Sequence, residues 1–109
     1  MRMWMVNPKR MCKQHLLGEH VELHMLVGSL RRGRSIDGFL AKRLLEPSSL
    51  RSRHAALVAE MRRRGYRHRS PLPRVYVARR YQMARVPRRT SERELISRCL
   101  DCRERGRAR

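Results

Sequence analysis

Residues 14–24 read QHLLGEHVELH and place three histidines and two glutamates in an otherwise apolar, helix-like stretch. His20 and His24 are four residues apart, a spacing at which two imidazoles on one helix can bind one zinc ion. At about 100° per residue, Glu22 lies about 160° round the helix from both histidines and could not serve as the base of that site. We therefore predict that His20 and His24 lie at the edge of the core, bonded to neighbouring backbone.

A second stripe of the same helix carries His15, Glu19 and Glu22. Two interpretations of its carboxylates stay open. They can be solvated side chains paired with the abundant arginines, since 28 Lys and Arg stand against 9 Asp and Glu. Alternatively, Glu22 acts on a cationic group, because a carboxylate in a basic groove would otherwise only weaken the binding of phosphate.

The start of the chain offers a nucleophile. Met1 precedes Arg2, and methionine aminopeptidase removes the initiator only before small residues, so we expect Met1 to keep a free α-amine. The α-amines of proteins have pKa values of about 7.7–8.0, against about 10.4 for lysine, so a fraction is neutral at physiological pH. A neutral amine can attack an aldehyde or a glycosidic carbon.

Three cysteines form an odd set in a chain without a signal peptide, which predicts reduced thiols rather than a disulfide framework. Cys99 and Cys102 are half of a zinc knuckle, which Cys12 or a histidine could complete across the fold. The alternative is a pair of thiols on the last helix. For the activity itself we predict no metal and no cofactor.

The elements that must position these residues follow from hydrophobic spacing. A first long helix is predicted over residues 11–32, with Gly33 as its stop, and a second over 50–64, with Ser48 or Ser49 as its N-cap. A short helix fits within 35–45.

The second half of the chain is less regular. Residues 66–86 contain Pro71 and Pro73 and are predicted to be extended or irregular. Ser91, with a glutamate three residues later, predicts a capping box that begins a final helix ending near Arg105. The fold class is thus mostly α, a single compact domain of about three helices over 1–105 with irregular basic connections, and 106–109 as a disordered tail.

The net charge is +19, which favours a polyanionic partner, although a GC-rich genome would also favour arginine. Arginine forks match phosphate oxygens, so nucleic acid is the predicted partner. No long apolar run is present, and we predict no membrane association. The chain is expected to be a monomer in the cytoplasm, associated with the nucleoid.

Three segments together carry a resemblance: MR at 1–2, QHLLGEHVEL at 14–23 and RRGY at 63–66. They resemble the pyrimidine-dimer DNA glycosylase and abasic-site lyase family of the phage endonuclease V type. The resemblance covers roughly residues 1–70 and includes the 21-residue interval from Met1 to Glu22.

The resemblance implies a helical DNA-repair enzyme, without a cofactor, that acts on damaged double-stranded DNA. The α-amine of Met1 would attack the deoxyribose C1′, the base would leave, and the resulting imine would undergo β-elimination. Glu22 would stabilise the cationic intermediate and help to move the proton. It also implies four residues that contact DNA or line the site: Arg2, Gln14, His15 and Arg31.

The sequence also departs from the family. Val21 and Met25 stand where the family has substrate-contacting arginines, and residues 74–109 hold only Tyr76 and Tyr81 as aromatic residues. These departures concern the lesion more than the amine chemistry, so pyrimidine dimers, a related base lesion or an abasic site alone stay open. The alternative function is a non-catalytic basic nucleic-acid-binding protein, in one version stabilised by zinc.

Overall fold

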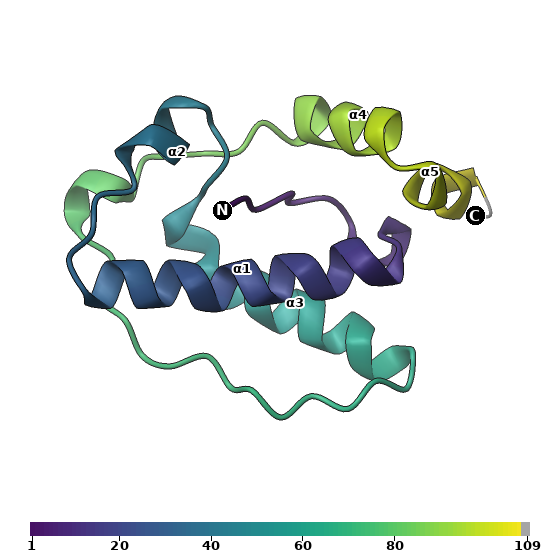
Figure 1. Cartoon of the computed structure of the whole chain (residues 1–109), viewed down its shortest axis with the longest axis horizontal. Coiled ribbons are helices and arrows are strands. Elements are labelled where there is room, and N and C mark those ends of the chain that lie inside the picture. Colours follow the sequence, from purple (N-terminus) through teal and green to yellow (C-terminus); the bar gives the residue numbers. More distant parts are fainter. Residues whose placement is uncertain (108–109) are drawn as a thin grey trace.

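The computed structural model describes residues 1–107, within which all regular structure is helical (Figure 1). The mostly α prediction is confirmed, with five α-helices in place of about three. The α-helices are α1 (Lys13–Arg31), α2 (Asp37–Ala41), α3 (Leu50–Arg63), α4 (Arg88–Arg98) and α5 (Leu100–Arg107). The short 3-10 helices are η1 (Pro8–Arg10), η2 (Pro47–Ser49) and η3 (Arg79–Tyr81). No described helix has the length and apolar character that crossing a membrane requires.

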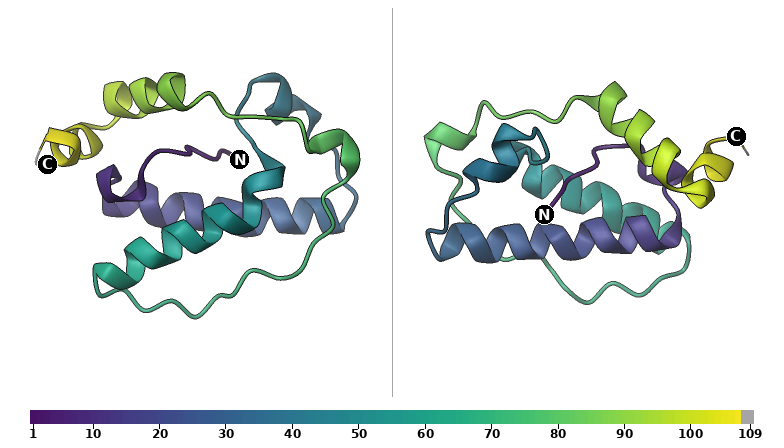
Figure 2. Two further views of the ribbon diagram at one scale, coloured as in Figure 1. Left: turned by 180° about the vertical axis from the view of Figure 1, so that it is seen from behind. Right: turned by 45° about the horizontal axis from the view of Figure 1, so that its top comes forward.

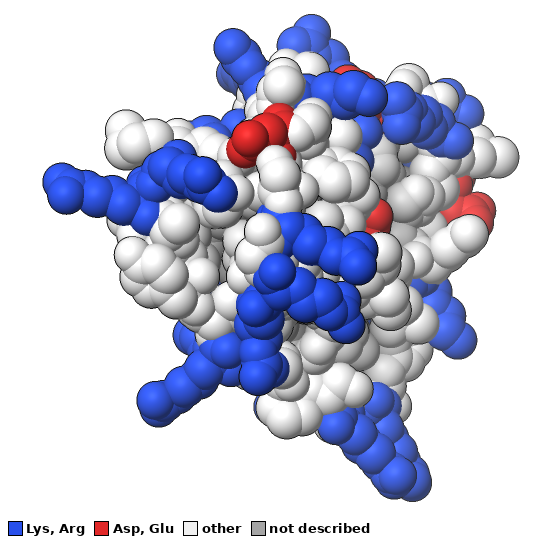
Figure 3. Space-filling model, turned by 60° about the vertical axis from the view of Figure 1, so that its left-hand side comes forward, with Lys and Arg blue, Asp and Glu red and all other residues white. Residues whose placement is uncertain are grey.

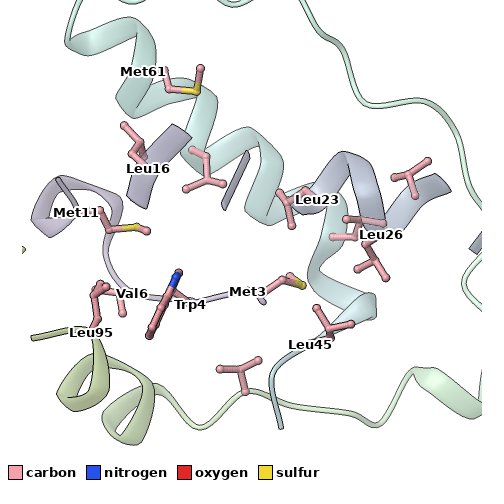
Figure 4. Close-up of a cluster of buried hydrophobic side chains, with 14 of the residues drawn as sticks. Met3, Trp4, Val6, Met11, Leu16, Leu23, Leu26, Leu45, Met61 and Leu95 are labelled. Atoms are coloured by element: carbon pink, nitrogen blue, oxygen red, sulfur yellow. The ribbon is translucent and has the colours of Figure 1, made fainter. Parts of the chain in front are cut away.

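The core lies between α1, α3 and the N-terminal segment (Figure 4). α1 buries Leu16, Leu23 and Leu26 along one stripe, and α3 contributes Leu57 and Met61. The two helices pack against each other, as their apolar spacing predicts. Both end before a glycine in the left-handed region, with φ of 68° at residue 33 and 84° at residue 65.

The N-terminal segment, residues 1–7, is extended and runs through the middle of the molecule, so that the chain begins beside the middle of α1 (Figures 1 and 2). Met3, Trp4 and Val6 are buried in the core. The backbone N–H of Met3 donates to the carbonyl of Leu44 at 2.8 Å. The start of the chain is therefore a packed element of the fold.

The C-terminal helices differ from the capping-box prediction, which is wrong. α4 begins at Arg88, and Ser91 is buried inside it, where its hydroxyl donates to the carbonyl of Trp4 at 2.5 Å. Cys99 is extended, with φ of −125° and ψ of 111°, and divides the predicted helix into α4 and α5. Of the predicted tail, Gly106 and Arg107 belong to α5, while 108–109 lie outside the described residues.

The structure of the connections agrees better with the sequence-based predictions. Residues 66–86 are irregular apart from η3, as the prolines predict. Ser49 precedes α3 but makes no capping hydrogen bond, because its hydroxyl donates to the carboxylate of Glu46. Glu46 also receives the backbone N–H of Val86 at 2.9 Å and pairs with Arg88, which ties the long connection to the start of α3.

Candidate active site

Glu22 lies half-buried at the middle of α1, beside the start of the chain. Burial raises the pKa of its carboxyl above the ordinary value. The charge of the N-terminal ammonium and a hydrogen bond from the backbone N–H of Arg2 act in the opposite direction. Met1 and Glu22, the two predicted catalytic residues, therefore lie near enough for the charge of the amine to act on the carboxyl, without forming an ion pair. A carboxylate facing an amine can stabilise positive charge that develops on the amine nitrogen.

Glu19, one turn earlier on α1, is in a different environment. Its side chain is fully buried and receives two hydrogen bonds from Arg53 of α3, Nε at 2.6 Å and Nη2 at 2.9 Å. Glu19 is therefore paired with an arginine, as one interpretation predicted, but the pair is buried and not solvated. Sequence analysis missed Arg53, although the signal was present: it lies three residues after Leu50 and four before Leu57, on the apolar face of α3.

The guanidinium of Arg2 has its partners outside α1. It pairs with Glu94 of α4 at 2.5 Å and stacks on the ring of Trp4, 3.7 Å from the ring centroid. Its Nε is buried and has no hydrogen-bond partner among the described residues. Arg2 thus borders the site through its backbone and carries one unsatisfied donor nearby.

The other three predicted DNA-contacting residues are spread along α1. Gln14 is exposed in the first turn, and Arg31 is exposed in the last turn, about 14 Å along the axis from Glu22 and half a turn round the helix. His15 is half-buried, and its Nδ1 faces sulfur atoms, at 3.2 Å from Cys12 and 3.7 Å from Cys102. The structure does not gather these three residues around Glu22.

The surface beside Glu22 is apolar at Val21 and Met25, the two positions at which the family has arginines. Val21 and Met25 are exposed, at 56% and 53%. The positive charge lies elsewhere: Figure 3 shows Lys and Arg crowded over the face that includes the end of α1, α2 and η3. The exposed basic residues of these elements and their connections are Arg31, Arg32, Arg34, Lys42, Arg43, Arg79 and Arg80.

Four histidines cluster on the side of α1 that faces away from Glu22, about 160° round the helix. The Nε2 atoms of His20 and His68 are 3.0 Å apart, so the predicted backbone partner of His20 is wrong. His24 and His54 each bury an Nε2 that has no partner within residues 1–107. Burial and the neighbouring rings lower the pKa of His20 to about 4. A cavity of about 500 Å³ adjoins His54 and His68, but neither Met1 nor Glu22 lines it.

Two groups of side chains could hold a metal ion: His20, His54 and His68, and Cys12, His15, Cys99 and Cys102. In each group the candidate ligand atoms lie within 4.8 Å of one another. Neither group includes Met1 or Glu22. Metal chemistry and amine chemistry would therefore occupy separate places in this molecule.

The comparison with known proteins identifies the family of the chain. A family model for pyrimidine dimer DNA glycosylases matches residues 1–73. The chain belongs to this family. No curated protein and no solved structure matches it. Membership in the pyrimidine dimer DNA glycosylase family supports a role as a DNA-repair glycosylase with DNA as its substrate. The matched region holds Met1, Glu22, α1 and α3, whereas α4 and α5 lie beyond it.

Proposed function

We propose that this protein is a pyrimidine-dimer glycosylase and abasic-site lyase that uses the α-amine of Met1 as its nucleophile. The observation that carries the proposal is the position of the half-buried carboxylate of Glu22 close enough to the N-terminal ammonium for that charge to lower its pKa, inside the region matched by the glycosylase family. Neither group needs a cofactor for this chemistry.

In the first step, the neutral amine of Met1 forms a bond to C1′ of the deoxyribose, and the bond from C1′ to the base breaks. The base leaves with the bonding electrons and takes up a proton, and the sugar ring opens to a protonated imine. Loss of a proton from C2′ then forms the C2′–C3′ double bond and expels the 3′ phosphate. Water finally hydrolyses the imine and releases the amine. Glu22 stabilises the positive charge in each of these species and relays the protons.

The packing of the N-terminal segment supports this role, because a nucleophile reacts faster when it is held in place. Three contacts immobilise the residues after Met1: the backbone hydrogen bond of Met3 to Leu44, the ion pair of Arg2 with Glu94, and the hydrogen bond from Ser91 to Trp4. Flexible termini lack such contacts.

DNA contact is the second part of the proposal. Arg2, Gln14 and Arg31 would touch the duplex, and the surrounding basic surface would neutralise phosphates. The unsatisfied Nε of Arg2 supports a contact next to the reacting sugar. Val21 and Met25 would place apolar surface, in place of the family's arginines, against unstacked bases. This difference would affect which lesion the protein recognises. We further propose that the protein acts as a monomer on nucleoid DNA.

Borohydride trapping tests the proposal. The protein, with its N-terminus verified by mass spectrometry, is incubated with a duplex containing one abasic site or one cyclobutane dimer, and then reduced. We expect a covalent protein–DNA product whose attachment maps to Met1 and which disappears after reductive methylation of the amine. DNA binding without any trapped product would overturn the proposal and favour a non-catalytic DNA-binding protein.

A further inference from the structure

Four metal-binding side chains from opposite ends of the chain meet at one point. Cys12 is the N-cap of α1 and His15 lies in its first turn, while Cys99 separates α4 from α5 and Cys102 lies in the first turn of α5. Each pair is separated by two residues, which gives C-x-x-H at one end of the chain and C-x-x-C at the other. This spacing within a pair is common in structural zinc sites.

The distances match a tetrahedron of ligands. Zinc–sulfur bonds of about 2.3 Å and zinc–nitrogen bonds of about 2.0 Å place neighbouring ligand atoms roughly 3.5–3.8 Å apart in a tetrahedral site. The sulfur atoms of Cys12 and Cys99 are 3.8 Å apart, and the Nδ1 of His15 is 3.7 Å from the sulfur of Cys102 and 3.2 Å from that of Cys12. All three thiols are free, and a disulfide would need sulfur atoms about 2.05 Å apart.

Each sulfur also receives one backbone N–H. The N–H of His15 points to the sulfur of Cys12 at 3.5 Å, that of Cys12 to Cys102 at 3.2 Å, and that of Cys102 to Cys99 at 3.4 Å. Hydrogen bonds of this kind stabilise thiolates and orient them toward a metal. Cys12 and Cys102 are buried, while Cys99 and His15 are half-buried, so solvent can reach the site.

We propose that Cys12, His15, Cys99 and Cys102 bind one zinc ion that fastens α5 to the N-terminus of α1. Zinc binding converts three thiols to thiolates and releases their protons to solvent, while His15 ligates through Nδ1 and keeps its proton on Nε2. If His15 also contacts DNA, the contact would then be made by its Nε2–H group. The site takes up the structural-zinc alternative left open for Cys99 and Cys102, and it leaves the activity itself without a metal.

The site would hold the C-terminal helices over the N-terminal segment. α4 contacts that segment and η1 through the buried hydrogen bond of Ser91 to Trp4 and through two ion pairs, Arg2 with Glu94 and Arg10 with Glu92. α5 contacts η1 through the hydrogen bond of Arg105 to the carbonyl of Lys9. The contacts of Arg10 and Arg105 are exposed, and such contacts are weak. Four metal bonds would hold the junction of α5 and α1 more firmly than these exposed contacts do.

Metal content and spectroscopy test the site without using DNA-repair activity. The full chain is purified under reducing conditions, its zinc is measured, and the zinc is exchanged for cobalt(II). We expect about one zinc ion per chain, and for cobalt a tetrahedral spectrum with sulfur-to-cobalt charge-transfer bands. X-ray absorption should give three sulfur ligands and one nitrogen ligand.

Variants assign the ligands. His15→Ala should weaken zinc binding by more than about 100-fold, whereas His15→Cys should retain zinc with four sulfur ligands. Cys102→Ser should weaken the charge-transfer bands, because it removes one of three sulfur ligands. His68→Gln is the matched control, because it removes a histidine of the other cluster and should leave those bands unchanged.

Three results would overturn the proposal: a reduced protein that binds no zinc, coordination that contains no sulfur, or charge-transfer bands of unchanged intensity in Cys102→Ser. A Cys12–Cys99 disulfide that survives reducing purification would overturn it as well. Measurement on the unaltered chain keeps the test decisive even if a variant fails to fold.

Discussion

Two glutamates one turn apart on α1 meet opposite environments. Glu19 is fully buried and both of its oxygens are bonded by Arg53, whereas Glu22 is half-buried and faces the N-terminal amine and the backbone N–H of Arg2. The first carboxylate has a permanent partner supplied by α3. The second has a partner that can react. The comparison teaches that the tertiary structure gives two glutamates of one helix different environments, of which one stabilises the fold and the other fits the catalytic role that we propose.

The sharpest way to test this comparison is Glu22→Gln. We expect base removal to slow by about 10²–10⁴-fold, because an amide of the same shape carries no negative charge to offset the imine. Single-turnover rates on a dimer-containing duplex measure the effect. Glu104→Gln, which alters an exposed carboxylate of α5, should keep the full rate. Equal rates for Glu22→Gln and the unaltered protein would remove Glu22 from the mechanism.

The complementary change, Glu19→Gln, should act on stability. It leaves the guanidinium of Arg53 buried without its charged partner, so we expect the free energy of unfolding to fall by about 3–5 kcal/mol. Denaturant unfolding measures the loss. The double variant Glu19→Met with Arg53→Met is the control and should recover most of the stability, since it removes both buried charges. If Glu19→Gln unfolds like the unaltered protein, the buried pair does not support the fold.

Arg31→Ala tests how far the reactive surface of α1 extends. Arg31 is half a turn round the helix from Glu22, so we expect it to contact phosphate and not the reacting sugar. The slope of log affinity against log salt should decrease by about 1, while the rate at saturating protein stays unchanged. A changed rate would place Arg31 in the reacting site.

The smallest expected effect is the stability of Glu22→Gln as a function of pH. Burial raises the pKa of Glu22 in the folded state, so the ionised carboxylate destabilises the fold above that pKa, and the cost disappears as pH falls below the unfolded value of about 4.5. Glu22→Gln should therefore be more stable than the unaltered protein at pH 7, by less than about 1 kcal/mol in this half-exposed position. The two proteins should have equal stability near pH 4. A difference that grows as pH falls would contradict the raised pKa.

Local sequence predicted much of the fold. The helix expected over 11–32 is α1, and that expected over 50–64 is α3, because apolar spacing and a terminal glycine are signals contained in a few neighbouring residues. The start of α4 was missed because the prediction relied on local signals alone. Ser91 resembles an N-cap locally, but its hydroxyl is used by Trp4, 87 residues away in sequence.

The candidate site was predictable in part. The resemblance carried by residues 1–2 and 14–23 named Met1 and Glu22, and the structure brings them together. It did not separate Glu19 from Glu22, since both stand on the same stripe of α1 and only the position of Arg53 distinguishes them. Likewise, C-x-x-C at 99–102 suggested half of a zinc site without identifying which residues complete it.

The sequence by itself determined the two long helices α1 and α3, the excess of positive charge and the chemical groups present, because these depend on residue type and short-range spacing. Only the tertiary structure decided which groups meet. Glu19 pairs with Arg53 across 34 residues, His20 with His68 across 48, and Cys12 with Cys102 across 90. No local signal specifies such pairs, since they form when the burial of α1, α3 and the N-terminal segment in one core brings distant parts of the chain into contact.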